Sequence, residues 1–495
     1  MSLYALHLRC TSSFTSWKES NAKLANLDIQ ADKRPSYPSV PKSPIWTAMP
    51  VDYKKLKMLR RSRVVWGSWR IWKPRAVFWV GAIAVGLISV GFAWAADRAQ
   101  HLFFAATSSG KWAFLLPLII TPLGFTLCAW LAITVFPNAG GSGIPQAIAA
   151  RHLRDDADRS RLLSLKLAFG KVVLTVAGLL SGASIGREGP TVQVGASIML
   201  QAARWGGMAQ AKGLILAGSA AGIAAAFNTP LAGIVFAIEE MSKTYESRAN
   251  GLVLTAVILS GLASLALVGS YTYFGTSSVM AKTTMDWLLV LVCGVGGGAF
   301  GALFSAGALR LSARIRRFAQ TMPLKRMLAV AAACGLASAV IGIATGGATF
   351  GTGYEQARAA IEGEAAPSFF FIEKLAATFL AMMSGIPGGI FAPSLSVGAG
   401  FGSTMAGLLG TSIGLGAIVG MAGYFAGVVQ APMTAFVIIL EMTGNHEGVI
   451  PIMAASMLGY LTSRLFSREP LYHGLSRVFI AQSIRARRAA QATET

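Results

Sequence analysis

The sequence predicts an all-α, polytopic membrane protein, from its composition, the length of its uncharged stretches and the interruptions within them. Of the 495 residues, 54% are hydrophobic and only 13% are charged, whereas soluble domains carry about a quarter charged residues. No Asp, Glu, Lys, Arg or His occurs from 375 to 440, and about 20 apolar residues are enough for one spanning helix. Glycine and proline interrupt these stretches, which indicates an inverted-repeat bundle that contains broken helices.

Apolar stretches recur along the chain and predict well over ten helical segments. They lie at 76–96, 112–150, 213–238, 251–281, 287–309 and 327–354. A transmembrane barrel would instead show segments of about ten residues that alternate between apolar and polar side chains. The 55 glycines suit a helical bundle, because helices in lipid pack closely at small residues.

The charged residues are unevenly distributed, and this predicts the orientation of the chain. The net charge is +22, which in a soluble protein would suggest a nucleic-acid partner. Here residues 1–75 hold 15 Lys or Arg against four Asp or Glu, residues 310–326 hold six basic and no acidic residues, and residues 355–374 hold four Glu against two basic residues. By the positive-inside rule, we expect a protein of the cell inner membrane with both termini and 310–326 cytoplasmic, 355–374 outside, and no nucleic-acid partner.

Three strings place glycine just before proline, a residue tolerated in the first turn of a helix. They are Gly141-Ser142-Gly143-Ile144-Pro145-Gln146, Gly186-Arg187-Glu188-Gly189-Pro190 and Gly388-Gly389-Ile390-Phe391-Ala392-Pro393. We expect each string to begin a half-helix inside the membrane. A first turn leaves about four N–H groups unpaired and carries roughly half a positive charge. Several such N-termini meeting at one point predict an anion site near the membrane midplane.

In this order the three strings resemble the CLC family of chloride channels and chloride/proton exchangers, over about residues 76–475. The string from Phe227 to Gly233 and the pair Glu239-Glu240 strengthen the resemblance. It implies a homodimer in the lipid bilayer, with one pathway for chloride and protons in each subunit and no cofactor or metal. Only 23 residues follow Tyr472, so we expect a bacterial type without C-terminal regulatory domains.

The resemblance also divides the chain. Composition and charge predict a basic, partly disordered cytoplasmic segment at 1–75, and the resemblance implies a transmembrane domain at 76–475, followed by a short cytoplasmic tail at 476–495. Within the transmembrane domain, the two inverted halves are expected at about 76–272 and 285–466.

Six residues take their roles from the resemblance. The anion-binding groups are the hydroxyls of Ser142 and Tyr472 and the backbone N–H groups of Ile390 and Phe391. Glu188 is similar to the gating glutamate that competes with the anion and accepts protons on the outer side, and Glu240 to the inner proton-transfer glutamate. Glu239 and Glu240 point about 100° apart on a helix, so the choice of Glu240 rests on the resemblance. Glu441 is assigned a structural role.

The residues by themselves leave simpler roles open. Ser142 is also suited to cap a helix, and Tyr472 to be an aromatic residue at the membrane interface. Glu188 is also suited to a local role, held by nearby amides and Arg187. An intramembrane carboxylate is costly, however, and is usually functional, and burial favours its neutral form. Protonation would then free the site for chloride.

Two other functions remain open on sequence grounds. One is a passive chloride channel of the same family, although such channels usually lack the glutamate found here as Glu240. The remote one is an intramembrane serine protease, because Gly140-Gly141-Ser142-Gly143 fits a GxSG string. That chemistry needs a base beside the serine, and the five histidines all fall in tails, loops or segment ends. We therefore expect a transporter and no enzyme.

Overall fold

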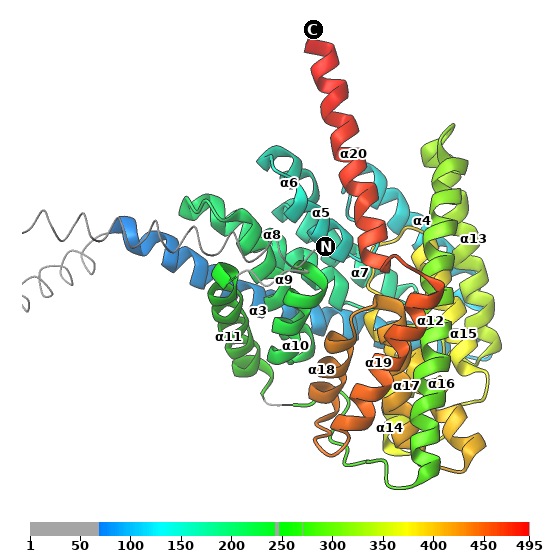
Figure 1. The fold of residues 1–495 in the computed structure, drawn as a ribbon. Coiled ribbons are helices and arrows are strands. Elements are labelled where there is room, and N and C mark those ends of the chain that lie inside the picture. Colours follow the sequence, from blue (N-terminus) through cyan, green and yellow to red (C-terminus); the bar gives the residue numbers. More distant parts are fainter. Residues whose placement is uncertain (1–68, 243–246, 270, 495) are drawn as a thin grey trace, which may run out of the picture. The chain divides into compact units, whose positions relative to one another are not determined.

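The computed structural model describes residues 69–242, 247–269 and 271–494, and this part of the chain is helical almost throughout (Figure 1). Its β-structure is confined to two isolated bridges between loops. Seven of its helices are long and apolar enough to cross a membrane. The predicted all-α membrane fold is therefore confirmed. The predicted segment 1–75 lies outside the described residues, apart from its last few residues, where the first helix begins.

The first half of the described chain runs from α3 to α11. Its elements are α3 (Trp69–Ser108), η1 (Ala113–Leu115), α4 (Pro117–Thr134), α5 (Ile144–His152), α6 (Asp156–Leu162), α7 (Leu165–Leu180), α8 (Glu188–Gly206), α9 (Ala211–Phe227), α10 (Pro230–Phe236), the π-helical turn η2 (Ala237–Ser242) and α11 (Ser247–Val268).

The second half runs from α12 to α19 and is followed by a last helix, α20. Its elements are α12 (Thr284–Ala319), α13 (Pro323–Ala344), α14 (Tyr354–Glu362), α15 (Phe370–Met383), α16 (Phe391–Leu409), α17 (Ile413–Val429), α18 (Pro432–Thr443), α19 (Val449–Phe466) and α20 (Leu471–Glu494). The predicted tail at 476–495 is the continuation of α20. As expected, a single helix, α13, connects the basic segment 310–326 to the acidic segment 355–374.

The two halves repeat the same series of elements. The helices α8 and α16 have 19 residues each, α9 and α17 have 17 each, and α5 and α14 have nine each. The chain then turns at Asn228 and Gln430, two non-glycine residues with φ of 56° and 59°. Pro230 and Pro432 open the next helix in each half. The repeat is thus preserved in helix lengths and turns.

Reciprocal caps indicate that the two repeats are inverted. Glu239, just after α10, accepts a hydrogen bond of 2.6 Å from the backbone N–H of Thr434, in the first turn of α18. Glu441, near the end of α18, accepts one of 2.7 Å from the backbone N–H of Ala232, in the first turn of α10. Each carboxylate therefore lies beside the N-terminus of the other helix, which requires the two helices to run antiparallel. The structural role predicted for Glu441 is confirmed.

Two buried lysines occupy equivalent positions in the repeats. Lys171 on α7 donates to the carbonyl of Gly141, in the loop before α5, at 2.6 Å. Lys374 on α15 donates to the carbonyl of Gly351, in the loop before α14, at 2.8 Å. Both side chains are fully buried, and unpaired carbonyls are costly in a low-dielectric interior. These lysines therefore fix the loops that lead into the two nine-residue helices.

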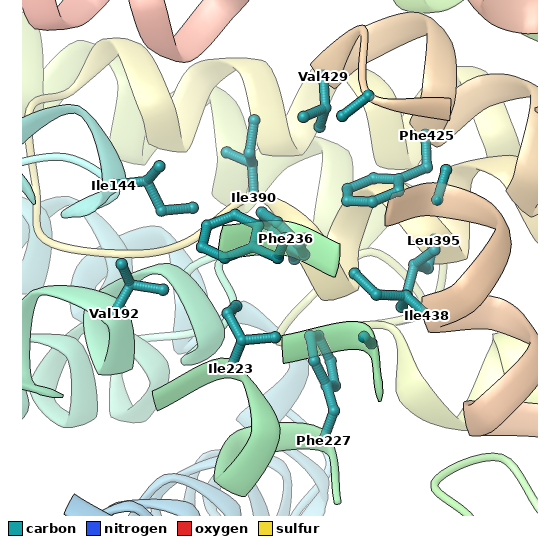
Figure 2. Packing of buried hydrophobic residues seen from close by; sticks show 14 of the residues in the cluster. Ile144, Val192, Ile223, Phe227, Phe236, Ile390, Leu395, Phe425, Val429 and Ile438 are labelled. Atoms are coloured by element: carbon teal, nitrogen blue, oxygen red, sulfur yellow. The ribbon is translucent and has the colours of Figure 1, made fainter. Parts of the chain in front are cut away.

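Side chains from both halves share one hydrophobic core (Figure 2). Ile144 and Val192 come from the first repeat, and Ile390 and Phe425 come from the second. Phe236, near the centre of the view in Figure 2, packs against the ring of Phe391, with centroids 6.1 Å apart. The starts of α5 and α16 are therefore embedded in protein, where a charged or polar ligand would be shielded from lipid.

The helix lengths correct one prediction. At 1.5 Å per residue, the nine residues of α5 span about 14 Å, which fits the predicted half-helix. The 19 residues of α8 and of α16 span about 28 Å, so the half-helix prediction is wrong for these two. The strings at 186–190 and 388–393 mark helix starts and carry no information about where the helices end. Each of these two helices instead ends at a left-handed glycine, Gly207 or Gly410.

Candidate anion site

The loops that precede α5, α8 and α16 are hydrogen-bonded to one another. The amide of Gly141 donates to the carbonyl of Ile386 at 3.1 Å, and the amide of Gly388 donates back to Gly141 at 3.1 Å. Gly186 and Gly389 exchange a pair of backbone hydrogen bonds of 2.7 Å each. The loop before α16 therefore bridges the other two loops. As predicted, the three helix N-termini come together.

Glycine is required where these segments touch. A Cβ atom on Gly189 would meet the hydroxyl of Ser142 and lie 2.8 Å from its carbonyl oxygen, closer than real Cβ contacts. The same atom would lie 3.3 Å from Cα of Gly389. The loop that carries Ser142 also needs φ of 71° at Gly141 and 102° at Gly143, which glycine adopts without steric cost.

We predict that Gly189→Ala destabilises the protein by about 1–3 kcal/mol, as is usual for overpacking a tight core. The added methyl group would displace the Ser142 loop from the start of α8, so chloride should also protect the variant less against heat. Thermal unfolding in detergent, with and without chloride, tests this. Gly91→Ala is the control, because no atom lies within 4 Å of its added Cβ. Equal behaviour of the two variants would contradict the prediction.

Ser142 and Tyr472 bring two hydroxyl groups to this point. They are 9% and 0% exposed. The two side chains lie close enough to interact, yet neither hydroxyl oxygen has a hydrogen-bond partner of good geometry. Both residues line a cavity of about 500 Å³, together with Ile390. Because buried polar groups are normally paired, two unpaired hydroxyls in one cavity fit a ligand that accepts hydrogen bonds.

The start of α16 supplies the backbone donors. Ile390 is the residue before the helix and Phe391 is its first residue, so their N–H groups belong to the first turn, which has no partners within the helix. The ring of Phe391 stacks on that of Tyr472, with centroids 6.1 Å apart and 19° between the planes. The structure thus brings together all four residues predicted to bind the anion.

Glu188 is the first residue of α8 and is fully buried. Its carboxylate lies beside its own backbone N–H and that of Ala392, in the first turn of α16. Neither carboxylate oxygen has a hydrogen-bond partner of good geometry. The carboxylate therefore lies between two helix N-termini, in the kind of position that favours an anion.

Arg187 does not hold the Glu188 carboxylate. Its guanidinium donates to the Asp97 carboxylate at 2.7 Å and to the carbonyl of Ala93 at 2.8 Å. Both partners lie on α3. The local role in which Arg187 pairs with Glu188 is therefore not what the structure contains, and Glu188 lacks a side-chain partner.

A second cavity adjoins Arg187, the residue next to Glu188. It measures about 910 Å³ and is lined by Arg187, Asp97, Tyr271 and Glu355, among others. The cavity at Ser142 is lined by Arg316 of the basic segment 310–326, whereas Glu355 belongs to the acidic segment 355–374. The first cavity is thus lined by residues before and at the start of α13, and the second by a residue after its end. Ser142 lines the first cavity, and Arg187, next to Glu188, lines the second.

The adjacent glutamates of η2 have different surroundings. Glu239 accepts hydrogen bonds from the backbone N–H groups of Met433 (3.1 Å) and Thr434 (2.6 Å) and from the Thr434 hydroxyl (2.7 Å). Glu240 is 1% exposed and lies near the Tyr472 phenol. Glu239 is therefore a helix cap, whereas Glu240 is the glutamate that lies near Tyr472.

Sequence reasoning missed several residues of this region. His473 lies 3.3 Å from Glu240, measured from Nδ1 to Oε1, although its position at a segment end gave no reason to select it. The carbonyl partners of Lys171 were missed, because the sequence around a lysine does not indicate which carbonyls it meets. The break at Asn228 was also missed, although the following proline was a signal for a helix start.

The fold and the site together define a class of protein: a membrane protein of two inverted helical repeats, whose helix N-termini meet at a buried site suited to an anion. The family model described as voltage gated chloride channel matches residues 124–464. The chain is 31% identical over 436 residues to the H(+)/Cl(-) exchange transporter ClcA of Salmonella typhimurium, covering 81% of this chain and 88% of that protein. The same figures hold for the ClcA protein of Citrobacter koseri. This chain belongs to the voltage-gated chloride channel (CLC) family.

Solved structures agree on the fold. A slow cyanobacterial Cl-/H+ antiporter aligns with a TM-score of 0.70 at 22% identity, covering 83% of this chain and 98% of the other. A CLC-type fluoride/proton antiporter aligns with a TM-score of 0.66 at 23% identity, covering 83% and 99%. Membership of this family makes the chain an ion-transport protein and removes the serine protease alternative.

Proposed function

We propose that this protein exchanges chloride for protons across a membrane. The observation that carries the proposal is that two buried carboxylates, Glu188 and Glu240, both lie near the phenol of Tyr472, which adjoins the meeting point of three helix N-termini. The N-termini and hydroxyls suit an anion, and the carboxylates suit a proton. The exchange activity named for the ClcA relatives supports the same pairing of ions.

Chloride would bind between the hydroxyls of Ser142 and Tyr472 and the N–H groups of Ile390 and Phe391. Each hydrogen bond to a charged partner contributes roughly 1.5–3 kcal/mol, and the positive ends of the helix dipoles add to this. Four donors are enough to replace much of the hydration shell that the ion loses. The donors are neutral, so the ion is bound without a lysine or arginine that would trap it.

Glu188 would act as the gate and as the outer proton acceptor. When it is ionised, its carboxylate is itself an anion between the starts of α8 and α16, and it competes with chloride there. Protonation removes that charge and frees the position for chloride. One side chain thus couples the two ions. The Glu188 side chain occupies the anion position only when it is ionised, so binding a proton to it makes room for chloride.

Glu240 would carry protons between the inner side and Glu188. Protons need a separate route because the positive ends of helix dipoles repel cations. The Tyr472 phenol, which is close to Glu240, Glu188 and Ser142, marks the point where the two routes approach each other.

The arrangement in the membrane follows from the charge distribution. We infer that the cavity beside Arg316 opens to the cytoplasm and the one beside Glu355 to the outside, with both termini cytoplasmic and the chain in the cell inner membrane. The transmembrane domain would span about 76–475. We also infer a homodimer with one pathway in each subunit, as the resemblance implies.

Reconstitution tests the proposed exchange. The protein is placed in liposomes with a chloride gradient, and the pH inside and outside is recorded. An exchanger drives protons uphill against their own gradient at the expense of chloride. Chloride flux without proton movement would show the alternative, a passive channel of the same family.

We predict that bromide binds beside Ser142 and Tyr472, because helix N-termini and two unpaired hydroxyls meet there. Anomalous scattering from bromide-soaked crystals is the measurement. Ser142→Ala removes one donor and should weaken this peak relative to any peak at the protein surface. Bromide density at surface lysines alone, with none near Ser142, would contradict the prediction.

A further inference from the structure

His473 lies between Glu240 and a cavity that has room for several water molecules. Its Nδ1 lies 3.3 Å from Oε1 of Glu240, and its side chain is 19% exposed whereas that of Glu240 is 2% exposed. The histidine lines a cavity of about 670 Å³ together with Arg468, Glu469 and Arg477. A buried carboxylate is therefore reached from this cavity through one imidazole ring.

Glu239 is poorly suited to deliver protons to Glu240. Both of its oxygens accept hydrogen bonds from the first turn of α18, and protonation would cost the favourable interaction with that helix N-terminus. Glu239 also lines a different cavity, of about 720 Å³, with Tyr460 and Arg464. By contrast, Oε1 of Glu240 and Nδ1 of His473 lie 3.3 Å apart, and neither atom has a hydrogen-bond partner of good geometry among the described residues.

We propose that His473 is the residue through which protons pass between the inner aqueous side and Glu240. The inference rests on the proposed exchange and names the relay by which it is supplied. With its hydrogen on Nδ1, the ring gives that proton to Oε1 of Glu240 while Nε2 takes one from water in the cavity. The ring is then left with its hydrogen on Nε2. The reverse transfers, or a flip of the ring that turns the protonated nitrogen toward Glu240, restore the starting state. One proton enters and one leaves, and no other reactant is needed.

The charges around His473 suit this role. Glu240 faces it from η2, and His152 faces the same cavity from α5. Glu469, just before α20, is paired with Arg477 on α20 at 2.7 Å, so its charge is largely compensated. The nearest carboxylate available to the ring is therefore that of Glu240. An imidazole can both donate and accept a proton, whereas the guanidinium groups of Arg468 and Arg477 are hydrogen-bond donors only.

The test is His473→Gln in proteoliposomes, because glutamine keeps a polar side chain of similar size but does not shuttle protons near neutral pH. We expect proton flux to fall at least about tenfold while chloride flux stays within about twofold, since the change removes a positioned acid–base group. His152→Gln is the matched control. His152 lines the same cavity, but its Nδ1 lies 2.8 Å from the carbonyl of Ile148, and this variant should behave as wild type.

A second variant separates proton transfer from a structural role. His473→Ala should lose proton flux, and added imidazole should restore it, because the free ring can occupy the vacated position. Failure of imidazole to restore any proton flux would overturn the inference, as would wild-type coupling in His473→Gln. Wild-type protein that moves no protons uphill would overturn the proposed exchange itself. The two failures can be told apart, because a wild-type exchanger whose coupling persists in His473→Gln would overturn only the role of His473.

Discussion

Replacing Glu188 with alanine is expected to leave chloride flux in place and to abolish proton coupling. The substitution removes the carboxylate that we propose competes with chloride at the starts of α8 and α16, so the anion route should stay open. It also removes the proposed outer proton acceptor, and loss of such a group typically costs about 10²-fold or more in proton transfer. Chloride efflux and external pH, recorded together on the same proteoliposomes, measure both effects.

Glu364→Ala provides the control for removing a carboxylate. Glu364 is exposed between α14 and α15, so this variant should keep wild-type coupling. If Glu188→Ala still drove protons uphill, Glu188 would not be the gate. If it lost chloride flux as well, its carboxylate would be needed to keep the helix N-termini in position.

Replacing Glu240 with glutamine is expected to retain chloride transport and to lose proton transport almost entirely. Glutamine keeps the size and hydrogen-bonding capacity of the side chain but does not carry the proton. Because Glu240 lies outside the cavity that Ser142 lines, the anion donors should be unaffected. Proton flux is expected to fall about 10²-fold or more, in the same paired assay.

The neighbouring residue gives a sharp comparison. Glu239→Gln should keep both fluxes, because the structure gives Glu239 the role of a cap on α18. This substitution should instead lower the free energy of unfolding by about 1 kcal/mol, because it weakens a cap and removes a charge at a helix N-terminus. Unchanged proton coupling in Glu240→Gln would show that Glu240 does not carry the protons, and it would leave the proposed relay through His473 without its acceptor.

The sequence by itself determined the class of fold and the residues of the candidate anion site. Apolar stretches predict helices because each spanning segment must satisfy its own backbone hydrogen bonds in lipid. Glycine before proline predicts helix starts because both effects are local to a few residues. The resemblance then selected Ser142, Glu188, Ile390, Phe391 and Tyr472, which the structure brings together.

Only the tertiary structure decided what lies beside each of these groups. It distinguished Glu239 from Glu240, because Glu239 caps the N-terminus of α18 and Glu240 lies beside His473. It also showed that Arg187 donates to Asp97 and that Lys171 donates to the loop before α5. The sequence was silent on these pairs because the partners are distant along the chain, up to 233 residues apart for Glu240 and His473. A residue type and its local spacing predict a helix and its start, whereas the partner of a buried charge is set by how the two inverted halves pack.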